Sequence, residues 1–92
     1  FAVKVSGDSM VDEGIESGDV AIISPQILAE DGDIVAAYVE DRDGITLKKF
    51  KVIEGRPVLF PANPKYKPIT EKFEIQGKLV SILKQGEVAK TS

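Results

Sequence analysis

The sequence predicts a mainly β fold, a single domain of short, mostly antiparallel strands. Short apolar runs recur at a spacing of about 8–12 residues, and most are bounded by Gly, Pro or Asp. No long stretch repeats its apolar residues with the period of about 3.6 residues that marks a helix. The chain has 92 residues, enough for one domain with little room for a second. These observations together predict one sandwich-like or barrel-like β domain over residues 1–92.

Three strands are expected in the first half of the chain, at Phe1–Val5, Val20–Ile23 and Asp33–Glu40. Their apolar residues alternate or are rich in β-branched side chains, both of which are typical of strands. Ser6-Gly7-Asp8 ends the first strand, and Pro25 ends the second. After the third, Asp41-Arg42-Asp43-Gly44 favours a tight hairpin turn through its Asp-Gly pair. A short helix at Met10–Glu16 or Gln26–Asp31 has only weak support.

The second half of the chain predicts the returning strand Ile45–Ile53, a short strand at Val58-Leu59-Phe60, and one or two strands within Phe73–Leu83. Glu54-Gly55-Arg56-Pro57 supplies the turn between the first two. Three prolines, at positions 61, 64 and 68, mark an irregular stretch before the last segment. Gly77 interrupts that segment, which is a candidate sheet edge for pairing with a second copy.

The composition excludes several kinds of chemistry. The chain has no cysteine and no histidine, which rules out disulfides, a cysteine nucleophile, histidine- or thiolate-bound metals and a Ser-His-Asp triad. Its net charge is −3, so this domain by itself is not expected to bind a nucleic acid. No segment approaches the roughly 18 apolar residues needed to span a bilayer. Hydrolysis would require carboxylates, a serine or threonine with a lysine base, or an all-oxygen metal site.

The acidic clusters are interpreted as solvated turns. Glu40-Asp41-Arg42-Asp43-Gly44 has alternating acids but lacks the remaining ligands and the terminal Glu of a calcium loop. Asp12-Glu13 and Asp31-Gly32-Asp33 also have turn composition, and nothing indicates the sugar cleft that a glycosidase pair would need. We therefore expect no metal and no cofactor.

The segment Val5-Ser6-Gly7-Asp8-Ser9-Met10 is the first candidate for chemistry. A strand ends, glycine permits a sharp turn, and Ser9 follows two residues later. Such a loop can present a hydroxyl and direct successive backbone N–H groups toward one point, as an oxyanion hole requires. Ser-Gly-Asp-Ser is also ordinary turn composition, so the local sequence alone favours a surface loop.

A serine nucleophile in this chain needs a lysine or a carboxylate as its base. A lysine can serve if burial lowers its pKa, because the neutral amine must accept the proton. One face of the predicted strand carries Thr46, Lys48, Phe50 and Val52. Lys48 is therefore the candidate for a desolvated amine with a pKa below its ordinary value, whereas Lys49 and Lys51 are expected to be more solvated. A strand lysine more commonly lays its stem along the sheet and keeps its amine in water.

Several segments, in order along nearly the whole chain, resemble the LexA/UmuD-type family of self-cleaving repressors. They are Ser6–Met10, Asp12–Ile15, Ser17–Val20, Thr46–Phe50, Pro61–Ile69 and Phe73–Val80. The resemblance implies a LexA/signal-peptidase-like fold, a Ser-Lys peptidase with Ser9 as nucleophile and Lys48 as general base, and, less securely, the backbone N–H groups of Asp8 and Ser9 as oxyanion donors. It also implies self-cleavage that inactivates a repressor in the DNA-damage (SOS) response.

The same resemblance implies partners and a substrate. Family members form homodimers, are prompted to cleave by RecA filaments, and cut their own Ala-Gly or Cys-Gly bond. This chain contains neither bond. The cleavage segment, with a DNA-binding domain or a short tail, is therefore expected before Phe1, and a cytoplasmic protein of bacterial or phage origin is expected.

Other functions stay open at this point. An UmuD-like polymerase accessory protein and a phage repressor share the same motifs. A signal peptidase would also use a Ser-Lys dyad, but it usually has a proline where this chain has Asp12, and it carries a membrane anchor. A catalytically silent dimerisation domain is the non-enzymatic alternative.

Overall fold

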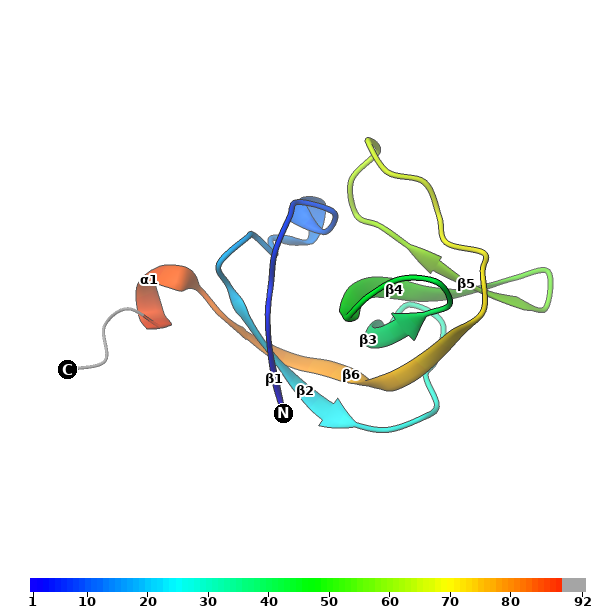
Figure 1. The fold of residues 1–92 in the computed structure, drawn as a ribbon, viewed down its shortest axis with the longest axis horizontal. Coiled ribbons are helices and arrows are strands. Elements are labelled where there is room, and N and C mark those ends of the chain that lie inside the picture. The colour runs from blue at the N-terminus through cyan, green and yellow to red at the C-terminus, as the bar shows by residue number, and fades with distance from the viewer. Residues whose placement is uncertain (89–92) are drawn as a thin grey trace.

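The computed structural model describes residues 1–88 and has one antiparallel sheet in the order β1-β2-β6-β3-β4-β5 (Figure 1). The strands are β1 (Ala2–Lys4), β2 (Val20–Pro25), β3 (Ile34–Val39), β4 (Ile45–Ile53), β5 (Arg56–Phe60) and β6 (Phe73–Leu83). One turn of 3-10 helix spans Val11–Glu13, and the short helix α1 spans Gln85–Val88. The predicted mainly β fold of antiparallel strands is confirmed.

The two halves of the sheet are joined by β6. Between Gly77 and Leu83 this strand pairs with β2, and between Phe73 and Lys78 it pairs with β3. The candidate position of Phe73–Leu83 at a sheet edge is therefore wrong, because β6 lies inside the sheet and the two outer strands are β1 and β5. Gly77 does not interrupt β6, which is one strand of 11 residues.

The two predicted hairpin turns differ in length. Glu54 and Gly55 alone connect β4 to β5, both with positive φ (51° and 78°), and β-strand twist favours this kind of two-residue turn. The β3–β4 connection is longer than the tight turn we expected, since Tyr38 and Ile45 are the last paired residues before it. Asp41 also takes a positive φ there, of 64°.

The remaining expectations are met in part. The 3-10 turn lies within Met10–Glu16, but residues 26–31 form no helix. β5 begins at Arg56, two residues before the predicted start, and includes Pro57. Proline is tolerated there because β5 is an outer strand and has neighbours on one side only.

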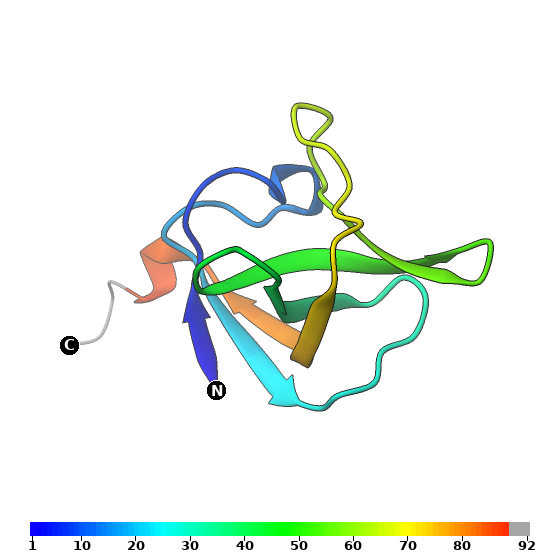
Figure 2. The same cartoon turned by 45° about the vertical axis from the view of Figure 1, so that its right-hand side comes forward.

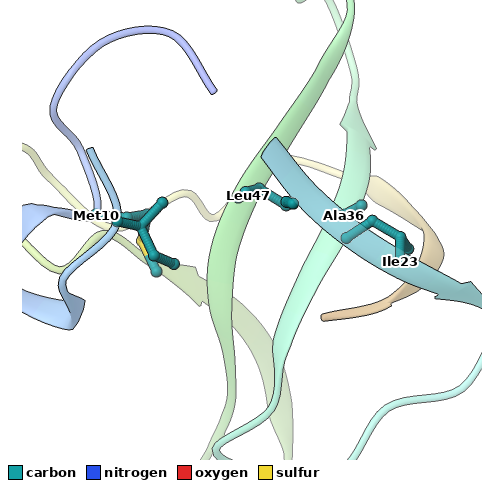
Figure 3. Close-up of a cluster of buried hydrophobic side chains, with 6 residues drawn as sticks. Met10, Ile23, Ala36 and Leu47 are labelled. Carbon is teal, nitrogen blue, oxygen red and sulfur yellow. The ribbon is translucent and has the colours of Figure 1, made fainter. Parts of the chain in front are cut away.

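Buried apolar side chains form two clusters, and β3 contributes to both. One cluster joins the segment after β1 to the sheet and contains Met10, Ile15, Ala21, Ile23, Ala36 and Leu47. Figure 3 shows Met10 beside the strands that carry Leu47, Ala36 and Ile23. The other cluster contains Val35, Ala37, Val39, Phe50, Leu59 and Ile69. Successive residues of β3 point in opposite directions, so this strand is buried on both faces.

The second cluster holds the long connection between β5 and β6 against the sheet. Ile69 and Leu59 exchange backbone hydrogen bonds of 2.8 and 3.2 Å. From there the connection rises above the sheet on the same side as the segment that follows β1 (Figure 2). This placement brings residues 61–66 next to the predicted serine loop.

β2 approaches β6 closely at Gly77. A Cβ atom at this position would overlap Ile23 Cγ2 and lie 2.5 Å from the Ser24 carbonyl oxygen. Gly77→Ala should therefore lower the free energy of unfolding by about 1–3 kcal/mol, the usual cost of overpacking a core. Urea denaturation would measure this loss. Gly86→Ala is the matched control because nothing lies within 4 Å of a Cβ there, and equal effects of the two substitutions would contradict the packing argument.

Candidate active site

The serine loop (residues 6–10) is held at both ends by the body of the domain. At its start, the Val5 amide donates to the Asp19 carbonyl at 2.8 Å, and Gly7 takes a φ of 82° that suits glycine. At its end, the Met10 side chain is only 3% exposed and packs in the first apolar cluster (Figure 3). Ser9 lies between these two anchors and is partly exposed.

Lys48 of β4 meets Ser9 across the fold. Lys48 Nζ lies 2.9 Å from Ser9 Oγ. The lysine residue is 7% exposed, so its amine does not extend into water as most strand lysines do. Phe50 on the same face is also buried, whereas Val52 further along is 45% exposed. The structure thus brings together the two residues predicted as nucleophile and base, and their catalytic roles stay predictions.

Burial lowers the pKa of Lys48 below its ordinary value, and the positive charge of Arg42 lowers it further. Two other oxygens accept hydrogen bonds from Lys48 Nζ: Thr46 Oγ1 at 2.7 Å and the Leu47 carbonyl at 3.1 Å. A neutral amine has two N–H groups and one lone pair. With both N–H groups on these two oxygens, its lone pair faces the Ser9 hydroxyl.

The other lysines of this strand differ from Lys48. Lys49 is half-buried, more enclosed than we expected, and forms an ion pair of 2.9 Å with Glu13. Lys51 is also half-buried, with its amine 5.7 Å from the centre of the Phe60 ring. Neither is placed as Lys48 is, against the serine hydroxyl.

The predicted oxyanion donors, the N–H groups of Asp8 and Ser9, make no hydrogen bond to another residue within residues 1–88, although the Asp8 N–H lies near its own carboxylate and helps to lower the pKa of that group. The carbonyl groups of the same two residues are occupied. Asn63 Nδ2 donates to the Asp8 carbonyl at 2.8 Å, and the Ala62 amide donates to the Ser9 carbonyl at 2.8 Å. Two amides that donate to no other residue are compatible with an oxyanion hole at Ser9, and that role stays a prediction.

A groove of about 230 Å³ adjoins Ser9. It runs between β1 and the start of β4, and its apolar lining includes Val3, Val5, Ile45 and Leu47. Lys4, Arg42 and Asp43 add charge at this groove. Polar and apolar side chains therefore both line the space next to the Ser9 hydroxyl.

Asp19 secures the segment that follows the serine loop. Its carboxylate is buried and accepts hydrogen bonds from the Glu16 amide at 2.8 Å, Lys84 Nζ at 2.6 Å and the Gln85 amide at 3.2 Å. The ammonium of Lys84 is the main reason that the pKa of Asp19 is lowered. These bonds fix the turn at residues 16–19 to Lys84 and Gln85. The ion pair between Asp19 and Lys84 could not be predicted, since no sequence pattern links residues so far apart.

No group of three or more acidic side chains in residues 1–88 is arranged to hold a metal ion. The same part of the chain has no helix long and apolar enough to cross a membrane. The groups that meet at the site are the Ser9 hydroxyl, the buried amine of Lys48 and the backbone amides of the serine loop.

A hydroxyl bonded to a buried lysine beside a groove is the arrangement of serine peptidases that use lysine instead of histidine. Comparison with known families identifies the group. The Peptidase S24-like family model matches residues 1–80, and the chain belongs to this family.

Curated relatives of this chain carry the name LexA repressor. Those of Carboxydothermus hydrogenoformans and Leptospira interrogans serovar copenhageni are 45% and 43% identical to it, over 92% and 89% of this chain. That of Bifidobacterium adolescentis is 43% identical over 92% of this chain. The chain spans 43%, 40% and 33% of the length of these three proteins. It is thus similar to one part of each repressor.

The lowered pKa of Lys48 has a consequence for stability. At a pH between the lowered folded-state pKa and the unfolded value near 10.4, the unfolded chain binds more protons at this lysine than the folded chain. The lysine's contribution to stability therefore rises with pH through that window. In Lys48→Met this contribution is absent, so wild type should gain stability relative to the variant as pH rises.

Urea denaturation of both proteins at a series of pH values would measure this difference. Lys67→Met, at an exposed position, is the matched control and should change the free energy of unfolding little at any pH. If the difference between wild type and Lys48→Met stayed constant up to pH 10, the amine would not be desolvated in solution.

Proposed function

We propose that this chain is the serine endopeptidase domain of a LexA-like regulator, with Ser9 as nucleophile and Lys48 as general base. The contact of 2.9 Å between Lys48 Nζ and Ser9 Oγ is the observation that carries the proposal. Supporting it are the burial of the lysine, the adjoining groove and membership of a peptidase family.

In the proposed reaction, neutral Lys48 accepts the Ser9 proton while Oγ attacks the carbonyl carbon of a peptide bond. The resulting oxyanion is stabilised by the free N–H groups of the serine loop. Lys48 then gives the proton to the leaving amine, the C–N bond breaks, and an acyl ester remains on Ser9. A water molecule next loses a proton to Lys48 and attacks the ester, which releases the new carboxyl group and restores Ser9.

The reaction is slow whenever Lys48 carries a proton, because the amine must lose this proton before it can act as a base. Burial lowers its pKa, so the neutral fraction is larger than for a lysine in water, and it increases further as pH rises. A slow reaction suits a regulator that cuts each molecule once. The rate should therefore depend on pH through the protonation of Lys48.

The wider role is proposed from the relatives' names and from the family resemblance. By this proposal the domain occupies residues 1–92, forms a homodimer, and cuts its own longer polypeptide in the bacterial cytoplasm during the SOS response to DNA damage. A RecA filament prompts the cleavage, and DNA is bound by another domain. The chain has no Ala-Gly and no Cys-Gly bond, so the bond that is cut lies outside these residues.

A fluorophosphonate that forms a covalent bond with activated serines tests the dyad on the chain itself. Attack by Ser9 Oγ on phosphorus would expel fluoride and add a mass that locates the label. Ser9→Ala should abolish labelling, and Lys48→Ala should slow it by about 10³-fold or more, as loss of a catalytic base does in serine peptidases. The wild-type rate should rise with pH up to the pKa of Lys48.

Ser17→Ala, which removes another exposed hydroxyl outside the serine loop, is the control and should label like wild type. Cleavage of a peptide that contains an Ala-Gly bond provides a second measurement with the same variants. Labelling of wild type that is no faster than that of Lys48→Ala would reject the peptidase and favour a catalytically silent dimerisation domain.

A further inference from the structure

The connection between β5 and β6 contacts the serine loop at several points. Besides the two bonds to the Asp8 and Ser9 carbonyls, the Asp12 amide donates to the Ala62 carbonyl at 2.8 Å. Residues 62–66 are themselves ordered by Asn63, whose Oδ1 accepts from the Lys65 amide at 3.0 Å and whose carbonyl accepts from the Tyr66 amide at 3.1 Å. Residues 62–66 thus hold the serine loop in place. None of these residues has a role in the reaction proposed above.

The bond from Asn63 fixes the direction of a peptide N–H. In a trans peptide group the C=O and N–H vectors are antiparallel and lie in one plane. With the Asp8 carbonyl directed at Asn63 Nδ2, the Ser9 N–H is directed away from Asn63. The Asp8 carbonyl also accepts from the Val11 amide at 3.4 Å, which is a longer contact. Asn63 therefore sets where an oxyanion donor points.

The Asp8 carboxylate is held by the same connection. The Tyr66 hydroxyl donates to Asp8 Oδ1, and Lys65 Nζ lies 3.3 Å from Oδ2. The bond from Tyr66 is the main cause of the lowered pKa of Asp8, and the pKa of Tyr66 is raised in turn. The phenol consequently keeps its proton to a higher pH than a tyrosine in water does. The two ends of Asp8 are its backbone carbonyl and its side-chain carboxylate, and both thus form hydrogen bonds with residues 63–66.

We infer that Asn63 and Tyr66 are positioning residues for the oxyanion hole: through the two ends of Asp8 they hold the Asp8–Ser9 peptide group so that its N–H faces the reacting carbonyl. The inference rests on the proposed peptidase function. Neither residue takes part in the proton transfer between Ser9 and Lys48. Their loss should therefore slow the reaction at every pH and leave the pKa of Lys48 unchanged.

Fluorophosphonate labelling of Ser9 across a pH series tests this inference, because the phosphoryl oxygen needs the same donors as a peptide carbonyl. Tyr66→Phe removes one hydroxyl and should lower the plateau rate about 3- to 10-fold, and Asn63→Ala about 10-fold or more, both less than the roughly 10²–10³-fold lost with an oxyanion donor itself. The midpoint of the pH profile and the Lys48 pKa measured by NMR should not move.

Two controls isolate the effect. Tyr38→Phe removes the other tyrosine hydroxyl of the chain, on β3 and outside the groove, and should react at the wild-type rate. In a double-mutant cycle, Tyr66→Phe should cause no further loss once Asp8→Ala has removed its partner. Thermal denaturation would establish that each variant is folded at the assay temperature.

The results separate the inference from the proposed function. Wild type that fails to react shows that the peptidase proposal is wrong. Wild type that reacts, with Tyr66→Phe and Asn63→Ala as fast as Tyr38→Phe, overturns the positioning role alone. A shifted midpoint with an unchanged plateau also overturns it, since these residues would then act through Lys48.

Discussion

The burial of one lysine amine is the constraint on which the site depends. An amine with 7% of its residue exposed is stable only if its hydrogen-bonding capacity is met, and the oxygens of Ser9, Thr46 and Leu47 meet it. The Ser9 hydroxyl is thus one of the groups that make the burial of Lys48 tolerable. The same desolvation that costs stability at neutral pH lowers the pKa of the amine. The burial of Lys48 therefore accounts both for the loss of stability and for the lowered pKa of its amine.

The sheet accommodates this amine because its central strands are enclosed on both faces. β3 carries small or β-branched residues throughout its buried part, which lets one cluster form under the serine loop and another under the β5–β6 connection. Both loops are thereby held above the same region and bond to each other through Asp8, Ser9 and Asp12. The two loops are therefore positioned by the apolar clusters that they cover and by the hydrogen bonds between them.

Much of this arrangement could be predicted from local sequence. The β-branched runs located most strands, and the absence of histidine and cysteine left a lysine or a carboxylate as the base for a serine nucleophile. The choice of Ser9 and Lys48 rested mainly on the resemblance to a known family. The features that were predicted wrongly or not at all depend on residues far apart in the sequence. Nothing in Phe73–Leu83 reveals whether it lies at an edge or inside the sheet, because register depends on distant partners. The bonds from Asn63 to Asp8 and from Lys84 to Asp19 join residues 55 and 65 positions apart, beyond the reach of any local pattern.

The position of β6 has a consequence for the order of events during synthesis. Among residues 1–88, β6 is the strand that links the β1–β2 half, next to the serine loop, with the β3–β5 half, which carries Lys48. It also leaves the ribosome after the other five strands of this sheet. A nascent chain that lacks β6 has no sheet joining its two halves, and non-local strands pair late because closing long loops costs entropy. One sheet therefore joins the segment that carries Ser9 to the strand that carries Lys48 only after β6 has been translated. If the proposed peptidase acts on its own polypeptide, this order delays the reaction until β6 has been made.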